Sequence, residues 1–181
     1  MSEVESPYQV FVIDNHPITA IGVQGLFFRQ AHLNVCGSAG SIDDAKTHIS
    51  RKAPDLILLD IALGTDSGLE FLKEMHIEKP EIPILIFSMI DELLYTERCL
   101  RAGARGFVRK TQPCRELLAA INQAIEGNVY LSPEMSQRIM NMWAVDRNRE
   151  PSHGVEALSD RELAVLELIG DGLGTQKIAT F

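Results

Sequence analysis

The chain has 181 residues, of which 45% are hydrophobic and 23% are charged, and its formal net charge is −8. This composition supplies enough apolar material for a packed core and excludes a disordered, collagen-like or coiled-coil chain. Neither residues 1–128 nor the remainder carries a net positive charge, so charge alone argues against nucleic-acid binding.

Nothing in the sequence marks the chain for a membrane or for export. No apolar run approaches the roughly 18 residues that a membrane-spanning helix needs. The acidic beginning, MSEVESPYQV, lacks the pattern of an export signal. Cys36, Cys99 and Cys114 form no CxxC pair and no metal-ligand spacing. We therefore expect a cytoplasmic protein whose cysteines are packing residues.

Short β-rich apolar runs alternate with stretches of helical length along residues 8–126. The predicted strands are residues 8–13, 33–37, 56–59, 82–87 and 106–108. The predicted helices are residues 17–31, 41–52, 67–77, 91–102 and 113–126. Five repeats of this kind predict an α/β fold in which a doubly wound, five-stranded parallel sheet carries helices on both faces.

The pattern changes after Asn128. Ser132 and Pro133 predict the start of a further helix, because proline is favoured in the first turn. Apolar residues then recur at helical spacing, which predicts a packing stripe. Its members are Met135, Ile139, Met142 and Trp143.

The end of the chain is predicted to be helical after a linker. Residues 150–156, EPSHGVE, are polar and contain proline and glycine, which is typical of a linker. Ser159 and Glu162 match the S-x-x-E capping box ahead of an apolar helical run. Another helix is predicted to begin near Thr175.

Polar side chains follow the predicted strands. Asp14 and Asn15 come after the first strand, Asp60 after the third, Ser88 after the fourth and Lys110 after the fifth. Because the carboxyl ends of parallel strands form one edge of a sheet, we expect these side chains to share a site. His16, in contrast, is expected to face solvent or to start a helix.

This set of side chains suits phosphoryl chemistry. Carboxylate and carbonyl oxygens are the ligands that Mg²⁺ prefers. A lysine ammonium neutralises an arriving phosphoryl group, and a serine hydroxyl donates a hydrogen bond to it. A carboxylate beside a metal can attack phosphorus and form an acyl phosphate. Asp60 is the best candidate because it ends the most apolar strand.

Four segments resemble two-component response regulators of the NarL/FixJ class. They are VFVIDNHP at 10–17, PDLILLDIALGTDSGLE at 54–70, ILIFSMIDE at 84–92 and AGARGFVRK at 102–110. A fifth segment, LSDRELAVLELIGDGLGTQKIA at 158–179, resembles the opening of a LuxR-type helix-turn-helix domain. The resemblance implies a flavodoxin-like receiver domain over 7–128, a linker helix and linker over 129–157, and an incomplete, all-α helix-turn-helix segment over 158–181.

The resemblance also implies a role for each site residue. Asp60 would be the phospho-acceptor, and Asp14, Asn15, Asp60 and the backbone of Ala62 would hold Mg²⁺. Ser88 would be the switch hydroxyl, Phe107 the switch aromatic, and Lys110 the lysine that contacts the phosphoryl group. Ala62 and Ile90 would tune dephosphorylation.

The implied function is phosphoryl transfer from a sensor histidine kinase to Asp60, in a phosphorelay that controls transcription. The protein would not be a turnover enzyme, and homodimerisation is an expected readout. DNA binding would need a complete C-terminal domain, because residues 158–181 stop before a recognition helix. Without one, this chain is not expected to bind DNA specifically, and no membrane is implied.

Two departures from the family pattern keep alternatives open. Asn15 stands where a second acid is usual, which predicts weaker Mg²⁺ binding and leaves open a phosphorylation-independent pseudo-receiver that acts as a protein-interaction module. Ala62 and Ile90 offer no side chain that orients water, so we expect slow self-hydrolysis.

Ala62 also argues against an aspartate-nucleophile phosphatase, which needs an acid there. No GxGxxG follows any strand, which argues against a dinucleotide site.

Overall fold

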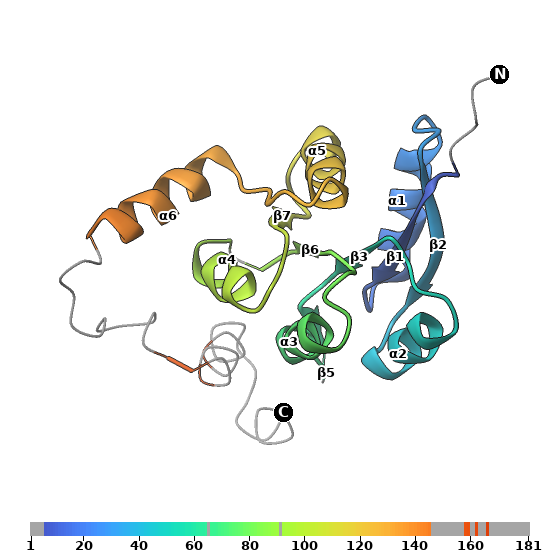
Figure 1. The fold of residues 1–181 in the computed structure, drawn as a ribbon, viewed down its shortest axis with the longest axis horizontal. Helices are drawn as coiled ribbons and strands as arrows, with labels where there is room; N and C mark the ends of the chain where they lie inside the picture. Colours follow the sequence, from blue (N-terminus) through green and yellow to red (C-terminus); the bar gives the residue numbers. More distant parts are fainter. Residues whose placement is uncertain are drawn as a thin grey trace. The chain divides into compact units, whose positions relative to one another are not determined.

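The computed structural model describes residues 6–64, 66–90, 92–145, 158, 159, 162 and 166. The chain forms two compact units, Met1–Gln137 and Arg138–Phe181. In the first unit the strands of the main sheet alternate with helices along the chain (Figure 1). Among the described residues, no helix combines the length and the apolar content that crossing a membrane requires.

Seven strands and six helices are described. The strands are β1 (Tyr8–Ile13), β2 (Leu33–Ala39), β3 (Leu56–Leu59), β4 (Ala62–Leu63), β5 (Asp66–Ser67), β6 (Ile84–Ser88) and β7 (Phe107–Arg109). The helices are α1 (Pro17–Phe27), α2 (Ile42–Arg51), α3 (Gly68–Glu78), α4 (Glu92–Arg101), α5 (Cys114–Ile125) and α6 (Pro133–Val145).

Five of the strands form one sheet in the order β2-β1-β3-β6-β7, and every pairing in it is parallel. The predicted five-stranded, doubly wound fold is therefore confirmed. β3 is the central strand, as its unbroken apolar sequence LILL suggests, since a strand covered on both faces has no solvent-facing side chain.

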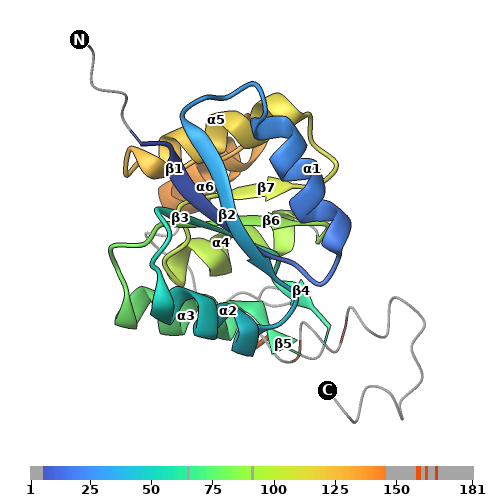
Figure 2. The ribbon, with the colours of Figure 1, turned by 90° about the vertical axis from the view of Figure 1, so that its right-hand side faces the viewer.

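The sheet is packed on both faces. Val10, Val12, Leu56 and Leu58 belong to one apolar cluster with residues of α1 and α5. Successive side chains of a strand point to opposite faces of the sheet. The alternate residues of β1 and β3 therefore face α2, α3 and α4, which cover the other face in Figures 1 and 2. Both alternating sets are buried, which explains why these strands read as continuous apolar runs.

Local signals at helix starts agree with the sequence. Ser41 precedes α2, and its hydroxyl accepts a hydrogen bond from the Asp44 N–H at 3.3 Å. Ser67 does the same for α3 by accepting from the Glu70 N–H at 3.2 Å. These serines satisfy backbone donors that the first helical turn leaves unpaired.

Apart from shifts of one or two residues at the ends of strands and helices, the structure differs from the prediction in two local respects. α1 ends at Phe27 rather than at residue 31, because the chain must turn back to begin β2 at Leu33. A small antiparallel hairpin, β4 with β5, follows β3 and was not predicted. Strands of two residues are too short to show a hydrophobic period, so this hairpin leaves no pattern in the sequence.

The segment after α5 is attached to the edge of the sheet. The Tyr130 N–H donates to the Arg105 carbonyl at 2.9 Å, and Tyr130 forms a parallel bridge with Gly106. The Tyr130 hydroxyl also donates to Glu116 on α5. Gly106 has a φ of +150°, and a Cβ there would lie 2.4 Å from the Tyr130 carbonyl oxygen, so glycine permits this close approach.

The predicted C-terminal features are described in part. α6 begins at Pro133 as expected. The capping box is confirmed: Ser159 donates to the Glu162 carboxylate, and the Glu162 N–H donates back to the Ser159 hydroxyl at 3.3 Å. The predicted linker at 150–156, the helix near Thr175, and the side chains of Met142 and Trp143 lie outside the described residues.

Candidate functional site

The parallel ladder brings the ends of four strands together. The Asp60 N–H donates to the Ile13 carbonyl at 2.9 Å, which sets Asp60 beside Asp14. The Lys110 N–H donates to the Ser88 carbonyl at 2.9 Å, which sets Lys110 beside Ser88. The parallel pairing of β3 with β6 joins the two halves. The site therefore forms because each strand ends at the same height in the sheet.

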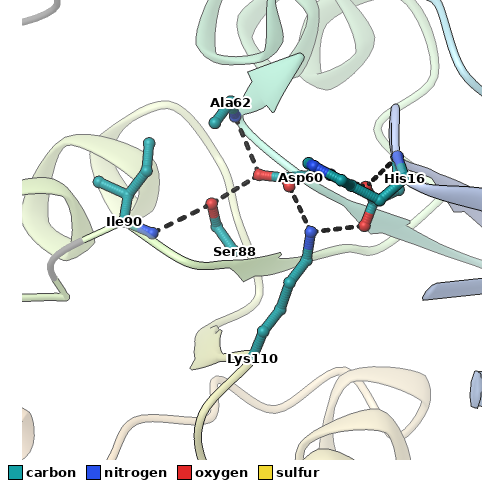
Figure 3. A network of polar contacts seen from close by, with 7 residues as sticks. His16, Asp60, Ala62, Ser88, Ile90 and Lys110 are labelled. Carbon is teal, nitrogen blue, oxygen red and sulfur yellow. Dashed lines mark hydrogen bonds and ion pairs between the residues drawn. The ribbon is translucent and has the colours of Figure 1, made fainter. Parts of the chain in front are cut away.

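Asp60 is the centre of the polar contacts (Figure 3). Its Oδ1 accepts from the Ser88 hydroxyl at 2.5 Å and from the Ala62 N–H at 2.9 Å. Its Oδ2 accepts from the Lys110 ammonium. The Asp60 side chain is only 3% exposed, and donors on two sides compensate its burial.

Asp14 is the second buried carboxylate. Its Oδ2 pairs with the Lys110 ammonium at 2.5 Å, and its Oδ1 accepts from the His16 N–H at 2.8 Å. Burial raises the pKa of Asp14, but hydrogen bonds from Lys110, His16 and Thr19 outweigh it, so the pKa is lower than usual. Asp14 is therefore an anion at neutral pH.

One turn geometry orients the side chains at three strand ends. In each case the side chain accepts from the backbone N–H two residues later. The pairs are Asp14 with His16 at 2.8 Å, Asp60 with Ala62 at 2.9 Å, and Ser88 with Ile90 at 3.4 Å. Such Asx- and ST-type turns tie a polar side chain to its own loop and thereby fix its direction.

Three other predicted site residues differ in their surroundings. Asn15 is exposed, and its Nδ2 lies 3.9 Å from the position that a Cβ would take on Gly64. Phe107 is fully buried at the start of β7 and belongs to the core. Ile90 is half-buried and takes part in the contacts through its backbone N–H.

Two residues near Asp14 were not predicted to take part. His16 is exposed and is the N-cap residue of α1, as expected, and in addition its ring Nδ1 lies 3.2 Å from Asp14 Oδ1. Thr19, in the first turn of α1, helps to lower the pKa of Asp14. His16 stands two residues after Asp14, the spacing of an Asx turn, so the proximity of its backbone was foreseeable, but the direction of its ring was not.

The donor set fits a divalent cation. The buried side chains at the centre carry two carboxylate charges against one ammonium charge, which leaves the pocket negative. Carboxylate oxygens are the ligands Mg²⁺ prefers. Among the described residues, one group could hold a metal: Asp14, His16 and Asp60 offer ligand atoms that lie within 4.8 Å of one another.

Comparisons with known proteins agree with this geometry. A model of the response regulator receiver domain matches residues 10–122. A Pseudomonas aeruginosa protein, provisionally named a transcriptional regulator, is 31% identical over 171 residues, 94% of this chain and 80% of that protein. The oxygen regulatory protein NreC of Staphylococcus aureus is 28% identical over 175 residues, 94% of this chain and 81% of NreC.

Among solved structures, a two-component response regulator of the LuxR family from Aurantimonas sp. is similar, with a TM-score of 0.70 and 27% identity. The match covers 77% of this chain and 99% of that one. The likeness therefore extends over about three quarters of this chain and nearly all of that one.

Proposed function

The chain belongs to the family of response regulator receiver domains, and on that premise we propose that Asp60 accepts a phosphoryl group from a sensor histidine kinase. The observation that carries this proposal is the position of the Lys110 ammonium between Asp60 and Asp14, with the Ser88 hydroxyl on the other oxygen of Asp60. This arrangement surrounds one carboxylate with the donors that a phosphoryl group needs.

In the proposed step a carboxylate oxygen of Asp60 attacks phosphorus. A P–O bond forms, the P–N bond of the phosphohistidine breaks, and the donor imidazole keeps the electron pair. Once Asp60 is an acyl phosphate it is a poorer acceptor, so Lys110 and Ser88 turn their donors to the phosphoryl oxygens. Phe107, at the start of β7, would repack as the neighbouring loop follows Ser88.

Mg²⁺ is the proposed cofactor, held by Asp14, Asn15, Asp60 and the Ala62 backbone. When bound, it would screen the charge of Asp60 and of the incoming phosphoryl group. The chain's own share of that screening is the Lys110 ammonium, which is 12% exposed and close to both carboxylates. Together, Mg²⁺ and Lys110 would offset the repulsion between the buried Asp60 carboxylate and the incoming phosphoryl group.

The wider role we propose is that of a cytoplasmic transcription regulator in a phosphorelay, with phosphorylation biasing a homodimer. The regulatory part of this role agrees with the names of the relatives from Pseudomonas aeruginosa and Staphylococcus aureus. In this assignment residues 7–128 are the receiver, 129–157 the linker, and 158–181 the beginning of the helix-turn-helix domain.

Labelling by acetyl phosphate in the presence of Mg²⁺ tests the phospho-acceptor. Asp60→Asn should abolish the label, because the nucleophilic oxygen is lost. Asp55→Asn is the matched control: Asp55 lies just before β3 and accepts from the Gln9 N–H, at the other end of the strand. Equal labelling of Asp60→Asn and the wild type would contradict the assignment.

The second candidate is a pseudo-receiver that acts without phosphorylation as a protein-interaction module. Asn15 favours it, because the pocket lacks the second acid usual in the family. Absence of any label on the wild-type chain, with Mg²⁺ and acetyl phosphate both present, would select this alternative.

We also propose that the acyl phosphate is long-lived. The Ala62 side chain is a methyl group, and the polar contact that Ile90 makes is through its backbone N–H, so neither side chain orients a water molecule. The phosphorylated half-life should be longer than that of an Ala62→Asn, Ile90→Glu double variant. An equal or shorter half-life of the wild-type chain would contradict this.

A further inference from the structure

The imidazole of His16 lies beside the carboxylate of Asp14 and does not cap the helix that follows it. His16 is the N-cap residue of α1, but its side chain makes no capping hydrogen bond. Serine, threonine, aspartate and asparagine are the usual side chains at that position because they accept from the first helical turn. The ring instead places Nδ1 3.2 Å from Asp14 Oδ1, within hydrogen-bond distance, and the His16 side chain is 66% exposed.

The separation of the His16 and Asp14 ligand atoms suits joint coordination of one ion. A tetrahedral Zn²⁺ with ligands at 2.0–2.1 Å separates neighbouring ligand atoms by about 3.3 Å. The separation of His16 Nδ1 and Asp14 Oδ1 is close to that value. Asp60 contributes the third ligand atom, within 4.8 Å of the other two.

The remaining contacts of the pocket leave the relevant atom of Asp14 facing the ring. Lys110 pairs with Oδ2 of Asp14, whereas Oδ1 is the oxygen beside His16. The neighbouring Asn15 brings no charge, so the pocket has fewer anionic oxygens than one with two adjacent acids. The loss of an anionic oxygen lowers the affinity for hard cations such as Mg²⁺ more than the affinity for transition-metal cations that also bind nitrogen ligands.

We propose that this pocket binds a borderline transition-metal dication, Zn²⁺ being the probe, through His16 Nδ1 together with oxygens of Asp14 and Asp60. The inference uses the same pocket as the proposed phosphoryl transfer but does not require that transfer to occur. Zn²⁺ and Mg²⁺ compete for the carboxylates, and the imidazole gives Zn²⁺ the tighter site.

Calorimetric titration of the untagged full chain with Zn²⁺, without any phosphoryl donor, tests the proposal. A Cys114→Ser background removes the one exposed thiol. His16→Gln should weaken Zn²⁺ binding on the order of 10–100-fold, because the nitrogen ligand is lost. The same change should leave Mg²⁺ affinity within about twofold, because the carboxylates are untouched.

His32→Gln is the matched control, since His32 is a solvent-accessible histidine that contacts Asn122 away from the pocket. Its Zn²⁺ affinity should stay within about twofold of the background. In the ¹⁵N spectrum of the imidazoles, Zn²⁺ should shift the His16 Nδ1 resonance and leave that of His32 in place. The spectrum also shows that each variant is folded.

Unchanged Zn²⁺ affinity in His16→Gln, or an equal loss in His32→Gln, would overturn the proposal. So would a His16 Nδ1 resonance that does not move. Failure of acetyl phosphate to label Asp60, with Zn²⁺ binding intact, would overturn the proposed function alone and leave this metal site standing.

Discussion

The interior of the sheet and the edge where its strands end are made by the same segments with opposite chemistry. Leu56–Leu59 is buried throughout and entirely apolar, and one residue later Asp60 is buried and charged. The first strand repeats this contrast at Ile13 and Asp14. Apolar burial stabilises the fold in proportion to area and tolerates many shapes, whereas a buried carboxylate is tolerated only where donors meet it.

Substitutions in the core and in the pocket should therefore change the free energy of unfolding in different ways. A core substitution changes the free energy of unfolding whatever the solution contains. A pocket substitution changes it by an amount that depends on cations and protons, because charge is what the pocket balances. The four predictions below test this distinction, beginning with the largest expected effect.

Leu58→Ala should lower the free energy of unfolding by roughly 3–5 kcal/mol, because it removes buried methyl groups and leaves a cavity in the central strand. Urea unfolding in EDTA and in Mg²⁺ should give the same loss. Ile21→Ala on α1, where the side chain is 62% exposed, should stay within about 0.5 kcal/mol. If Mg²⁺ restored the stability of Leu58→Ala, core and pocket substitutions would not differ in their dependence on cations.

Lys110→Met should cost roughly 2–4 kcal/mol in EDTA, because two buried carboxylates lose their shared cation. Added Mg²⁺ should restore part of that loss, since a bound cation stabilises the folded state by mass action. Arg101→Met is the control, because Arg101 pairs with Glu97 on the exposed face of α4. If Mg²⁺ left the unfolding midpoint of Lys110→Met unchanged, the pocket would not be the cation site.

Asn15→Asp should tighten Mg²⁺ binding on the order of tenfold, because it adds one anionic oxygen beside Asp14. Isothermal titration with Mg²⁺ measures this directly. Asn34→Asp, which adds the same charge on β2 where Asn34 contacts Gln9, should change little. Equal Mg²⁺ affinity of Asn15→Asp and the wild type would refute the charge argument.

Asp14 should give the smallest effect, and one that depends on pH. Its pKa is lowered in the folded chain from the ordinary value of 3.8. A group of this kind stabilises the fold fully at pH values well above 3.8, and the contribution disappears as pH falls through the lower, folded pKa. In EDTA, the unfolding free energy of wild type relative to Asp14→Asn should therefore fall between about pH 5 and pH 2. A constant difference would contradict the lowered pKa.

The fold was largely predictable because its signals are local. Runs such as Leu56–Leu59 are long and apolar enough to identify a buried strand. Ser41 and Ser159 are residue types that favour helix starts, and each caps a backbone N–H in the structure. The hairpin of β4 and β5 and the early end of α1 escaped prediction, because chain return and two-residue pairing depend on neighbours that are distant in sequence.

By itself, the sequence determined which chemical groups end the strands: carboxylates at 14 and 60, a hydroxyl at 88 and an ammonium at 110. The tertiary structure alone decided that one ammonium lies between both carboxylates and that the ring of His16 turns towards Asp14. The physical reason is that strand periodicity fixes the edge a side chain reaches, whereas its partners depend on register and rotamer, which are set only when the sheet is assembled.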